Sequence, residues 1–351
     1  MSNDTLFIIG AGASKEVDLP IGEELKKIIC NLIDFRYDTF GMLTHGDEKI
    51  VNAIKLNIKK ENKSDKTGDE IFNEYLLEAE HIKSNLIASY SIDNFIDTHR
   101  DNKKIALLGK LGIVKSILQK EKGSKLYFEN DQFDYNKINN TWYLKFFKSI
   151  TENCNKDDLK ERFKLIKFII FNYDRCVEHF LNNALKQYYR LTESEIAEIV
   201  NCLTIYHPYG SIGQLPLNST NYSIKFGADP TPENLLTLSG KIKTFTEGTD
   251  PNSSEIQKIK EIMSNTNRIV FLGFAFHKLN MQLIKPNSRP EYYPKYYASV
   301  YNISDSDQKL IKNDLDMMYR SSAFDVPNSE VFFLNSNCNE FYDAFKKGLS
   351  F

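Results

Sequence analysis

Short and almost wholly apolar runs alternate with helical patterns along this chain, and no other feature constrains the fold as strongly. The apolar runs lie at Thr5–Ile9, 165–173, 202–210, 267–276, 295–304 and 329–337. Runs of this length without polar alternation are typical of strands that are buried on both faces. Strands that alternate with helices form a parallel sheet with helices on both sides. The sequence therefore predicts an α/β fold with a doubly wound, Rossmann-like and mostly parallel sheet.

One long stretch of the chain lacks these apolar runs. Between about Asp34 and Ser149 the pattern is that of long helices, at 70–86 and 103–121, and the polar stretch 59–70 is predicted to be a solvated loop. We therefore predict a helical insertion at 34–149 within an α/β domain formed by residues 1–33 and 150–351. The proline-containing region 214–235 is predicted to be a loop.

Composition excludes several classes of protein. The formal net charge of -2 gives no general attraction to nucleic acid or to an anionic membrane surface. No apolar run approaches the roughly 18 residues of a membrane span, and the first residues lack the basic start of a signal peptide. The five cysteines are scattered, and none are paired as C-x-x-C. We expect a soluble cytoplasmic protein without metal, membrane partner or direct nucleic-acid partner.

The first apolar run ends in the sequence GAGAS at 10–14. A Gly-x-Gly turn between a strand and a helix lets backbone N–H groups approach a phosphate, so a nucleotide is predicted here. A dehydrogenase fingerprint would place its third glycine at Lys15, and its acidic residue, at the spacing of Asp34, would follow a second strand rather than a helix. No P-loop pattern is present either. A plain glycine turn without a ligand is the alternative.

Three later motifs follow apolar runs, where a doubly wound fold places its ligand-binding groups. In FNYD at 171–174, Asn172 and Asp174 are candidate ligand groups, although Asp174 also suits a helix cap. In IYHPYGS at 205–211, His207 is a candidate for proton transfer. In FLGFAF at 271–276, Gly273 repeats the glycine turn, and His277 and Asn280 beyond it are ligand or capping groups.

A fourth motif lies inside the predicted insertion. In SIDNFID at 91–97, Ser91 or Asp93 suits a helix cap, and the apolar residues suit a buried helix face. Asp93 and Asp97 are also candidates for binding or positioning a ribose.

Taken in order, GAGAS, SIDNFI at 91–96, FNYD, HPYGS at 207–211 and FLGFAFHKLN at 271–280 resemble the sirtuin family. The resemblance is to its bacterial branch of NAD-consuming, phage-defence proteins. It implies that Gly10, Ala11, Gly12 and Ser14 bind the NAD diphosphate, with Asp93, Gly273 and Phe274 also at the cofactor. It further implies that Asn172 and Asp174 hold the nicotinamide ribose and that His207 is catalytic. Sirtuin deacylases carry a four-cysteine zinc module, which the cysteines here cannot form.

The resemblance implies an NAD glycohydrolase that cleaves the nicotinamide–ribose bond and depletes NAD in abortive infection. Water is the expected acceptor, NAD is the substrate, and no metal is required. By the same analogy we expect a homo-oligomer and an ATPase partner encoded nearby. Two alternatives stay open, namely a sensor that holds NAD or ADP-ribose without cleaving it, and a deacylase without zinc.

Overall fold

The computed structural model describes residues 4–62, 65–129, 133–216, 223–248, 253–288, 293–318 and 329–351. At its centre is a six-stranded sheet with the order β5-β4-β1-β6-β7-β8, in which every pair of neighbouring strands is parallel. The strands are β1 (Thr5–Ile9), β4 (Ile166–Ile170), β5 (Thr204–Tyr206), β6 (Arg268–Leu272), β7 (Lys295–Ser299) and β8 (Val331–Leu334). Each lies within a predicted apolar run, and the predicted Rossmann-like α/β fold is confirmed.

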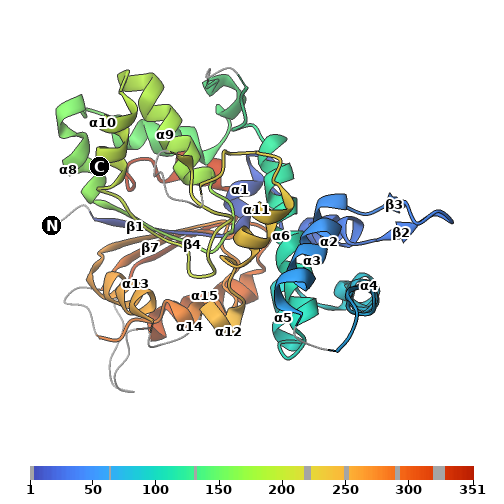
Figure 1. Cartoon of the computed structure of the whole chain (residues 1–351). Coiled ribbons are helices and arrows are strands. Elements are labelled where there is room, and N and C mark those ends of the chain that lie inside the picture. The colour runs from blue at the N-terminus through green and yellow to red at the C-terminus, as the bar shows by residue number, and fades with distance from the viewer. Residues whose placement is uncertain are drawn as a thin grey trace.

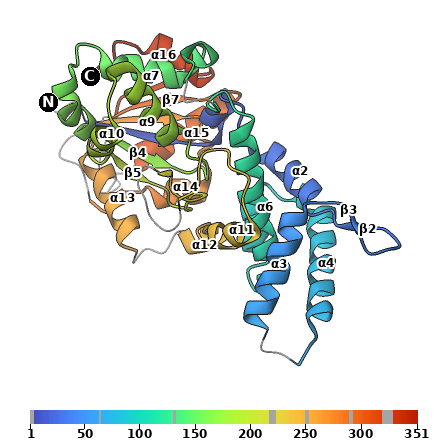
Figure 2. The same cartoon turned by 45° about the horizontal axis from the view of Figure 1, so that its top comes forward.

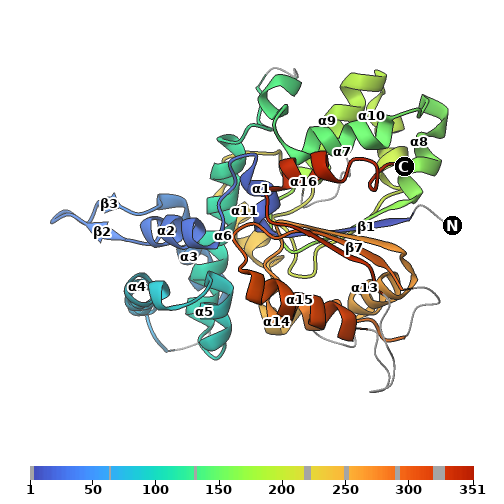
Figure 3. The same ribbon diagram turned by 180° about the vertical axis from the view of Figure 1, so that it is seen from behind.

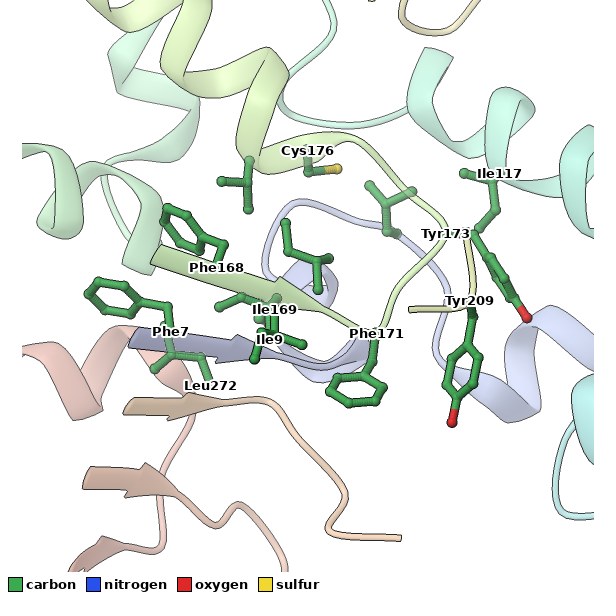
Figure 4. Packing of buried hydrophobic residues seen from close by; sticks show 14 of the residues in the cluster. Phe7, Ile9, Ile117, Phe168, Ile169, Phe171, Tyr173, Cys176, Tyr209 and Leu272 are labelled. Carbon is green, nitrogen blue, oxygen red and sulfur yellow. The ribbon is translucent and has the colours of Figure 1, made fainter. Parts of the chain in front are cut away.

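Helices cover both faces of the sheet (Figures 1 and 3). One face carries α7 (Trp142–Thr151), α8 (Leu159–Lys164), α9 (Cys176–Tyr189), α10 (Glu193–Val200) and α16 (Cys338–Ala344). The opposite face carries α13 (Ser254–Asn265), α14 (Lys278–Leu283) and α15 (Asp305–Met317). The central strands are therefore buried on both faces, which explains why they are continuously apolar. Phe7 of β1, for example, packs with its ring centroid 5.2 Å from those of both Phe146 and Phe168. Figure 4 shows Phe7 and Phe168 close together on the neighbouring strands β1 and β4.

A separate layer of helices lies beyond the carboxyl ends of the strands and extends away from the sheet (Figure 2). It contains α2 (Gly22–Leu32), α3 (Glu48–Glu61), α4 (Gly68–Asn85), α5 (Ile92–Thr98) and α6 (Lys103–Lys122). The later helix α11 (Pro232–Ser239) packs on α3 and α6. We call these six helices the helical layer. The predicted loop at 214–235 is wrong at its end, because the first four residues of α11 lie within it.

The predicted boundaries of the insertion stay a prediction, but the packing near them is clear. Helix α2 precedes the predicted start and packs on α6 of the helical layer, whereas α7 near the predicted end packs on α16 and α9. Shorter helical elements complete the chain: α1 (Ala11–Lys15), α12 (Phe245–Gly248), and the 3-10 turns η1 (Leu86–Ala88), η2 (Tyr135–Ile138) and η3 (Lys156–Asp158).

A small antiparallel hairpin, which the sequence did not predict, projects from the helical layer. It consists of β2 (Arg36–Tyr37) and β3 (Leu43–His45). The Asp38 carboxylate accepts hydrogen bonds from the backbone N–H groups of Phe40 and Met42, and Gly41 adopts a φ of 79°. Such turn chemistry joins two antiparallel strands, but these strands are too short and polar to show as an apolar run.

The helix at 22–32 occupies the place where a dinucleotide-binding fold has its second strand. Asp34, just beyond it, accepts hydrogen bonds from Arg36 at 2.7 Å and from Lys83 at 2.8 Å. These two cations lower the pKa of the Asp34 carboxyl group to about 2. Asp34 therefore ties the hairpin to α4, and its carboxylate is engaged in local ion pairs.

Candidate functional site

Two glycine turns meet at the carboxyl edge of the sheet, one after β1 and one after β6. The N–H of Gly12 donates to the carbonyl of Gly273 at 3.0 Å, and the N–H of Gly10 donates to the carbonyl of Leu272 at 3.0 Å. Gly273 has a φ of 55°, and a Cβ atom there would lie 2.0 Å from the backbone nitrogen of Ala13. A Cβ on Gly10 would lie 2.4 Å from the Gly273 oxygen. Close backbone packing therefore requires glycine here, whether or not a ligand binds.

A cavity of about 980 Å³ opens beside these turns. The chain passes outward from β1 to β4 and β5 and then returns to β6 on the other side of β1. The cavity therefore lies at the topological switch point, where open α/β sheets bind their ligands. Its wall on the sheet side includes Gly10, Ala11, Gly12, Phe171, Asn172, Tyr173, Tyr209, Gly273 and Phe274. Residues Tyr90, Ser91, Asp93 and Asn94 contribute from the helical layer, and Leu279, Asn280, Tyr301, Ser336 and Asn337 from the β6, β7 and β8 connections.

Asn172 is the polar side chain that the sheet holds most firmly against this cavity. It is buried, and its Nδ2 donates to the carbonyl of Gly10 at 3.1 Å and to Oγ of Ser14 at 3.0 Å. The strand β4 ends two residues earlier and pairs with β1 along its whole length, so both strands fix its position. The structure thus brings the FNYD motif and the glycine turn together, as the sequence predicts.

Ser14 and Asp174 lie behind the cavity wall and are not among its lining residues. Oγ of Ser14 lies 3.5 Å from the buried Tyr143 hydroxyl in addition to its bond with Asn172. The Asp174 carboxylate accepts the N–H of Cys176, the first residue of α9, at 3.1 Å. Arg175 is the N-cap residue, so Asp174 forms an Asx turn just before the helix and not the helix cap itself. Burial raises the pKa of Asp174. Both residues support the wall, and their predicted contact with a cofactor stays a prediction.

His207 also lies outside the cavity lining. Its Nε2 is 2.8 Å from Oε1 of Glu178, and its Nδ1 is 3.2 Å from the backbone carbonyl oxygen of Asn172. Burial lowers the pKa of His207, but the charge and hydrogen bond of Glu178 outweigh it, so the pKa is raised overall. The same pair lowers the pKa of Glu178 against the effect of its burial. His207 therefore contacts the cavity wall through the backbone of Asn172.

Asp93 brings a carboxylate into the cavity from the helical layer. Ser91 caps α5 by accepting the N–H of Asn94 at 3.0 Å, which leaves the Asp93 side chain available to Tyr173. The Tyr173 hydroxyl donates to the Asp93 carboxylate and so joins the helical layer to the end of β4. Burial raises the pKa of Asp93 to about 6, even though the Tyr173 hydrogen bond lowers it. Asp97 is not among the lining residues.

Aromatic side chains form much of the cavity wall. Phe274 is buried with its ring centroid 5.1 Å from that of Phe171, which in turn lies 5.7 Å from Tyr209. Figure 4 shows Phe171, Tyr173 and Tyr209 beyond the ends of the central strands. The Tyr209 hydroxyl donates to Oδ1 of Asn280 at 2.7 Å. Asn280 is thus hydrogen-bonded to Tyr209, another residue of the cavity wall. The side chain of His277 makes no capping hydrogen bond to α14.

Sequence reasoning missed three of these groups. Tyr173 and Tyr209 stand within the FNYD and HPYGS motifs, but the sequence pattern assigns a role to neither. Glu178 lies in the first turn of α9, where a carboxylate commonly stabilises a helix start. The signal for Tyr173 was its position between Asn172 and Asp174 at a strand end, and no pattern in the chain marks Glu178.

Within the described ranges, no three or more His, Cys, Asp or Glu side chains are grouped so that they could hold a metal ion. In the same part of the chain, no helix is both long and apolar enough to cross a membrane. Comparison with known proteins finds no matching family model and no matching curated protein.

Proposed function

We propose that this protein is an NAD glycohydrolase that releases nicotinamide and ADP-ribose. The observation that carries the proposal is the cavity of about 980 Å³ at the switch point of the sheet, where two glycine turns and Asn172 meet. Its volume lies at the upper end of the range for small-molecule sites, and its place in the fold is where nucleotides bind. We take NAD as the nucleotide because the sequence motifs resemble those of NAD-consuming sirtuins.

The cavity offers the groups that this reaction needs. The nicotinamide–ribose bond breaks through an oxocarbenium-like state, and nicotinamide leaves as a neutral molecule, so no strong acid is needed. Asn172 is held rigidly enough to orient the ribose or the attacking water. The Asp93 carboxylate, with a pKa raised to about 6, is mainly ionised at neutral pH yet basic enough to accept a proton from water.

The aromatic wall suits the same reaction. Phe171, Phe274 and Tyr209 exclude bulk water from one side of the cavity, which strengthens the electrostatic effect of Asp93 on a developing positive charge. The backbone of the Gly10–Gly12 turn lies at the cavity surface. Because the N–H groups of Gly10 and Gly12 already donate to backbone carbonyls, the N–H of Ala11 would be the donor of this turn to a diphosphate.

We further propose that cleavage depletes cytoplasmic NAD as a defence against phage and that assembly controls it. A constitutive hydrolase would exhaust the NAD of its own host cell. We therefore expect a homo-oligomer, activated together with an ATPase encoded nearby. Mass measurement in solution tests this part of the proposal, because a strict monomer with full activity would contradict it.

The direct test is incubation of the pure protein with NAD, alone and with its co-encoded partner, followed by measurement of free nicotinamide and ADP-ribose. Asn172→Ala and Asp93→Asn should each lose most of the activity. Asn287→Ala is the matched control, because Asn287 is exposed and bonds to Gln257 at 2.8 Å away from the cavity lining. Full activity in both cavity variants would overturn the assigned roles.

A sensor that binds NAD without cleaving it is the second candidate. The observation in its favour is that both ring nitrogens of His207 already have partners, so this histidine offers no free base to the cavity. Recovery of intact NAD from a saturated complex, with the partner present, would favour the sensor.

A further inference from the structure

The two half-buried histidines at and near α9 have different hydrogen-bond partners. His179 has an amide donor, Nδ2 of Asn183, at 3.3 Å from its Nδ1 and the carbonyl of Leu126 at 3.1 Å from its Nε2. One ring nitrogen accepts and the other donates, which is the pattern of a neutral imidazole. Burial accordingly lowers the pKa of His179 to about 3.

His207 has only acceptors. A carbonyl oxygen and a carboxylate oxygen both accept hydrogen bonds and cannot donate them, so each ring nitrogen of His207 must carry a hydrogen to bond. A ring with two N–H groups is an imidazolium. In this geometry His207 has no lone pair with which to take a proton from substrate or water.

The charged groups around His207 are consistent with a cationic ring. Glu178 approaches from α9 and Asp174 from the loop after β4, and both carboxylates favour the protonated ring. Arg175, the nearest cation on the same segment, is bonded to the buried carboxylate of Glu121 on α6 at 2.6 Å, which offsets its charge. Glu178 is therefore the direct counterion of His207.

The same contacts form a chain that leads to the cavity. The Nδ1–H of His207 donates to the Asn172 carbonyl, and the Asn172 side chain donates to Gly10 and Ser14. Of the residues in this hydrogen-bond network, Asn172 and Gly10 line the cavity, whereas His207 and Ser14 do not. The pair thus acts on the backbone of Asn172 from outside the cavity.

We propose that Glu178 and His207 are a positioning pair, in which a charged His207, held by the Glu178 carboxylate, fixes Asn172 at the cavity wall. His207 then works as a cation and not as the proton acceptor that the sequence predicts. The catalytic consequence rests on the proposed NAD cleavage, whereas the charge of His207 does not.

The charge state is tested first, on the wild-type protein and without NAD. The imidazole signals are followed by NMR through a pH titration, and the His207 signal is assigned by its loss in His207→Gln. We expect a charged His207 at neutral pH and a neutral His179 in the same spectra, which serves as the internal control. In Glu178→Gln the His207 midpoint should fall. A neutral His207 at neutral pH, or an unchanged midpoint in Glu178→Gln, would overturn the proposal.

The pH dependence of NAD cleavage then separates positioning from proton transfer. If His207 must be charged, activity is lost as pH rises through its raised pKa, and Glu178→Gln moves that loss to lower pH. A general base would instead gain activity as His207 loses its proton. We expect Glu178→Gln to lower kcat about 10-fold or more with a smaller change in KM, and Glu178→Asp to recover part of it.

Glu198→Gln is the matched control, because this exposed glutamate pairs with Lys160 at 2.7 Å on the outer surface. It should leave both the His207 titration and the activity unchanged. Activity that rises with deprotonation of His207 would overturn the positioning role. If the protein does not cleave NAD, the NMR titration still decides whether the Glu178–His207 pair is charged, so the two failures are distinguishable.

Discussion

The two walls of the cavity are built in different ways. The sheet wall has a backbone part, at the turns of Gly10–Gly12 and Gly273, which pack so closely that Cβ atoms cannot fit between them, and packed aromatic side chains beside it. The wall from the helical layer is made of side chains, with Asp93 bonded to Tyr173 and Tyr90 largely exposed. The sheet wall therefore has one tightly fixed shape, and the helical wall depends on a few side-chain bonds.

Under the proposed function, this difference assigns nucleotide binding to the sheet wall and control to the helical wall. A rigid wall at the strand ends suits the fixed parts of a nucleotide, such as its diphosphate. The helical wall can change the site if the helical layer shifts, since Asp93 and Tyr173 provide a direct hydrogen bond between the two walls.

The largest expected effect is on the sheet wall, in Gly273→Ala. The new Cβ would lie 2.0 Å from a backbone nitrogen, and the φ of 55° is unfavourable for alanine. We expect the free energy of unfolding, measured with urea, to fall by about 2–4 kcal/mol. NAD binding should be lost with it, because the turn after β1 must move.

Gly22→Ala is the control for that variant. Nothing lies within 4 Å of a Cβ at Gly22, which begins α2, so the free energy of unfolding should stay the same or rise slightly. Equal losses in the two variants would show that glycine itself, and not close packing at the turn, explains the effect.

Substitutions in the helical wall should lower activity more than they lower the free energy of unfolding. Tyr173→Phe removes the hydroxyl that bonds to Asp93, and Asp93→Asn removes the charge. We expect kcat/KM for NAD cleavage to fall about 10-fold or more in Asp93→Asn and less in Tyr173→Phe. The wild-type rate should also rise as pH increases through about 6, where Asp93 ionises.

Asp97→Asn, four residues along the same helix, should keep nearly normal activity because Asp97 does not line the cavity. If Asp97→Asn loses as much activity as Asp93→Asn, the helical wall does not act through the cavity.

A contact outside the cavity, between α9 and the segment that follows α6, has its own pH signature. His179 on α9 donates to the Leu126 carbonyl just after α6 and stacks on Phe226 at 3.9 Å. Its folded pKa of about 3 lies below the unfolded value, so its stabilising effect is full above about pH 6.5 and is lost as pH falls. The free energy of unfolding should drop by up to about 1.4 kcal/mol per pH unit below that point.

His179→Phe removes the titrating group and should flatten this slope, although the lost hydrogen bond lowers stability at all pH values. Chemical denaturation from pH 4 to pH 8 measures both variants. A slope that is the same with and without His179 would assign the acid sensitivity to other groups.

The smallest effect on stability is expected at the cavity rim, in Tyr90→Ser. Tyr90 is 88% exposed, so the free energy of unfolding should change by less than about 0.5 kcal/mol. Because Tyr90 lines the cavity, we expect KM for NAD to rise a few-fold. An unchanged KM would place the bound nucleotide away from the helical wall.

The sequence predicted the sheet wall far better than the helical wall. The strands and the polar residues at their ends are local patterns, so Gly10, Asn172 and Gly273 could be placed at one edge before the structure was known. The bond between Asp93 and Tyr173 joins residues 80 positions apart, and no local pattern encodes such a contact. For the same reason the sequence identified His207 but not its counterion Glu178.

The hairpin at Arg36–His45 shows a second limit of the sequence. Its residues are exposed or half-buried, and two very short strands carry no apolar periodicity. Its turn depends on Asp38 and Gly41, which taken alone are typical of any loop.

The central claim is that the cavity holds NAD and that Asn172 and Asp93 act on it there. The most direct measurement is a time course of NAD by proton NMR with the protein in molar excess and the co-encoded partner present, so that even one slow turnover is detected. The account predicts free nicotinamide and ADP-ribose with the wild-type protein and intact NAD with Asn172→Ala. Intact NAD with the wild-type protein, or equal cleavage by both proteins, would contradict it.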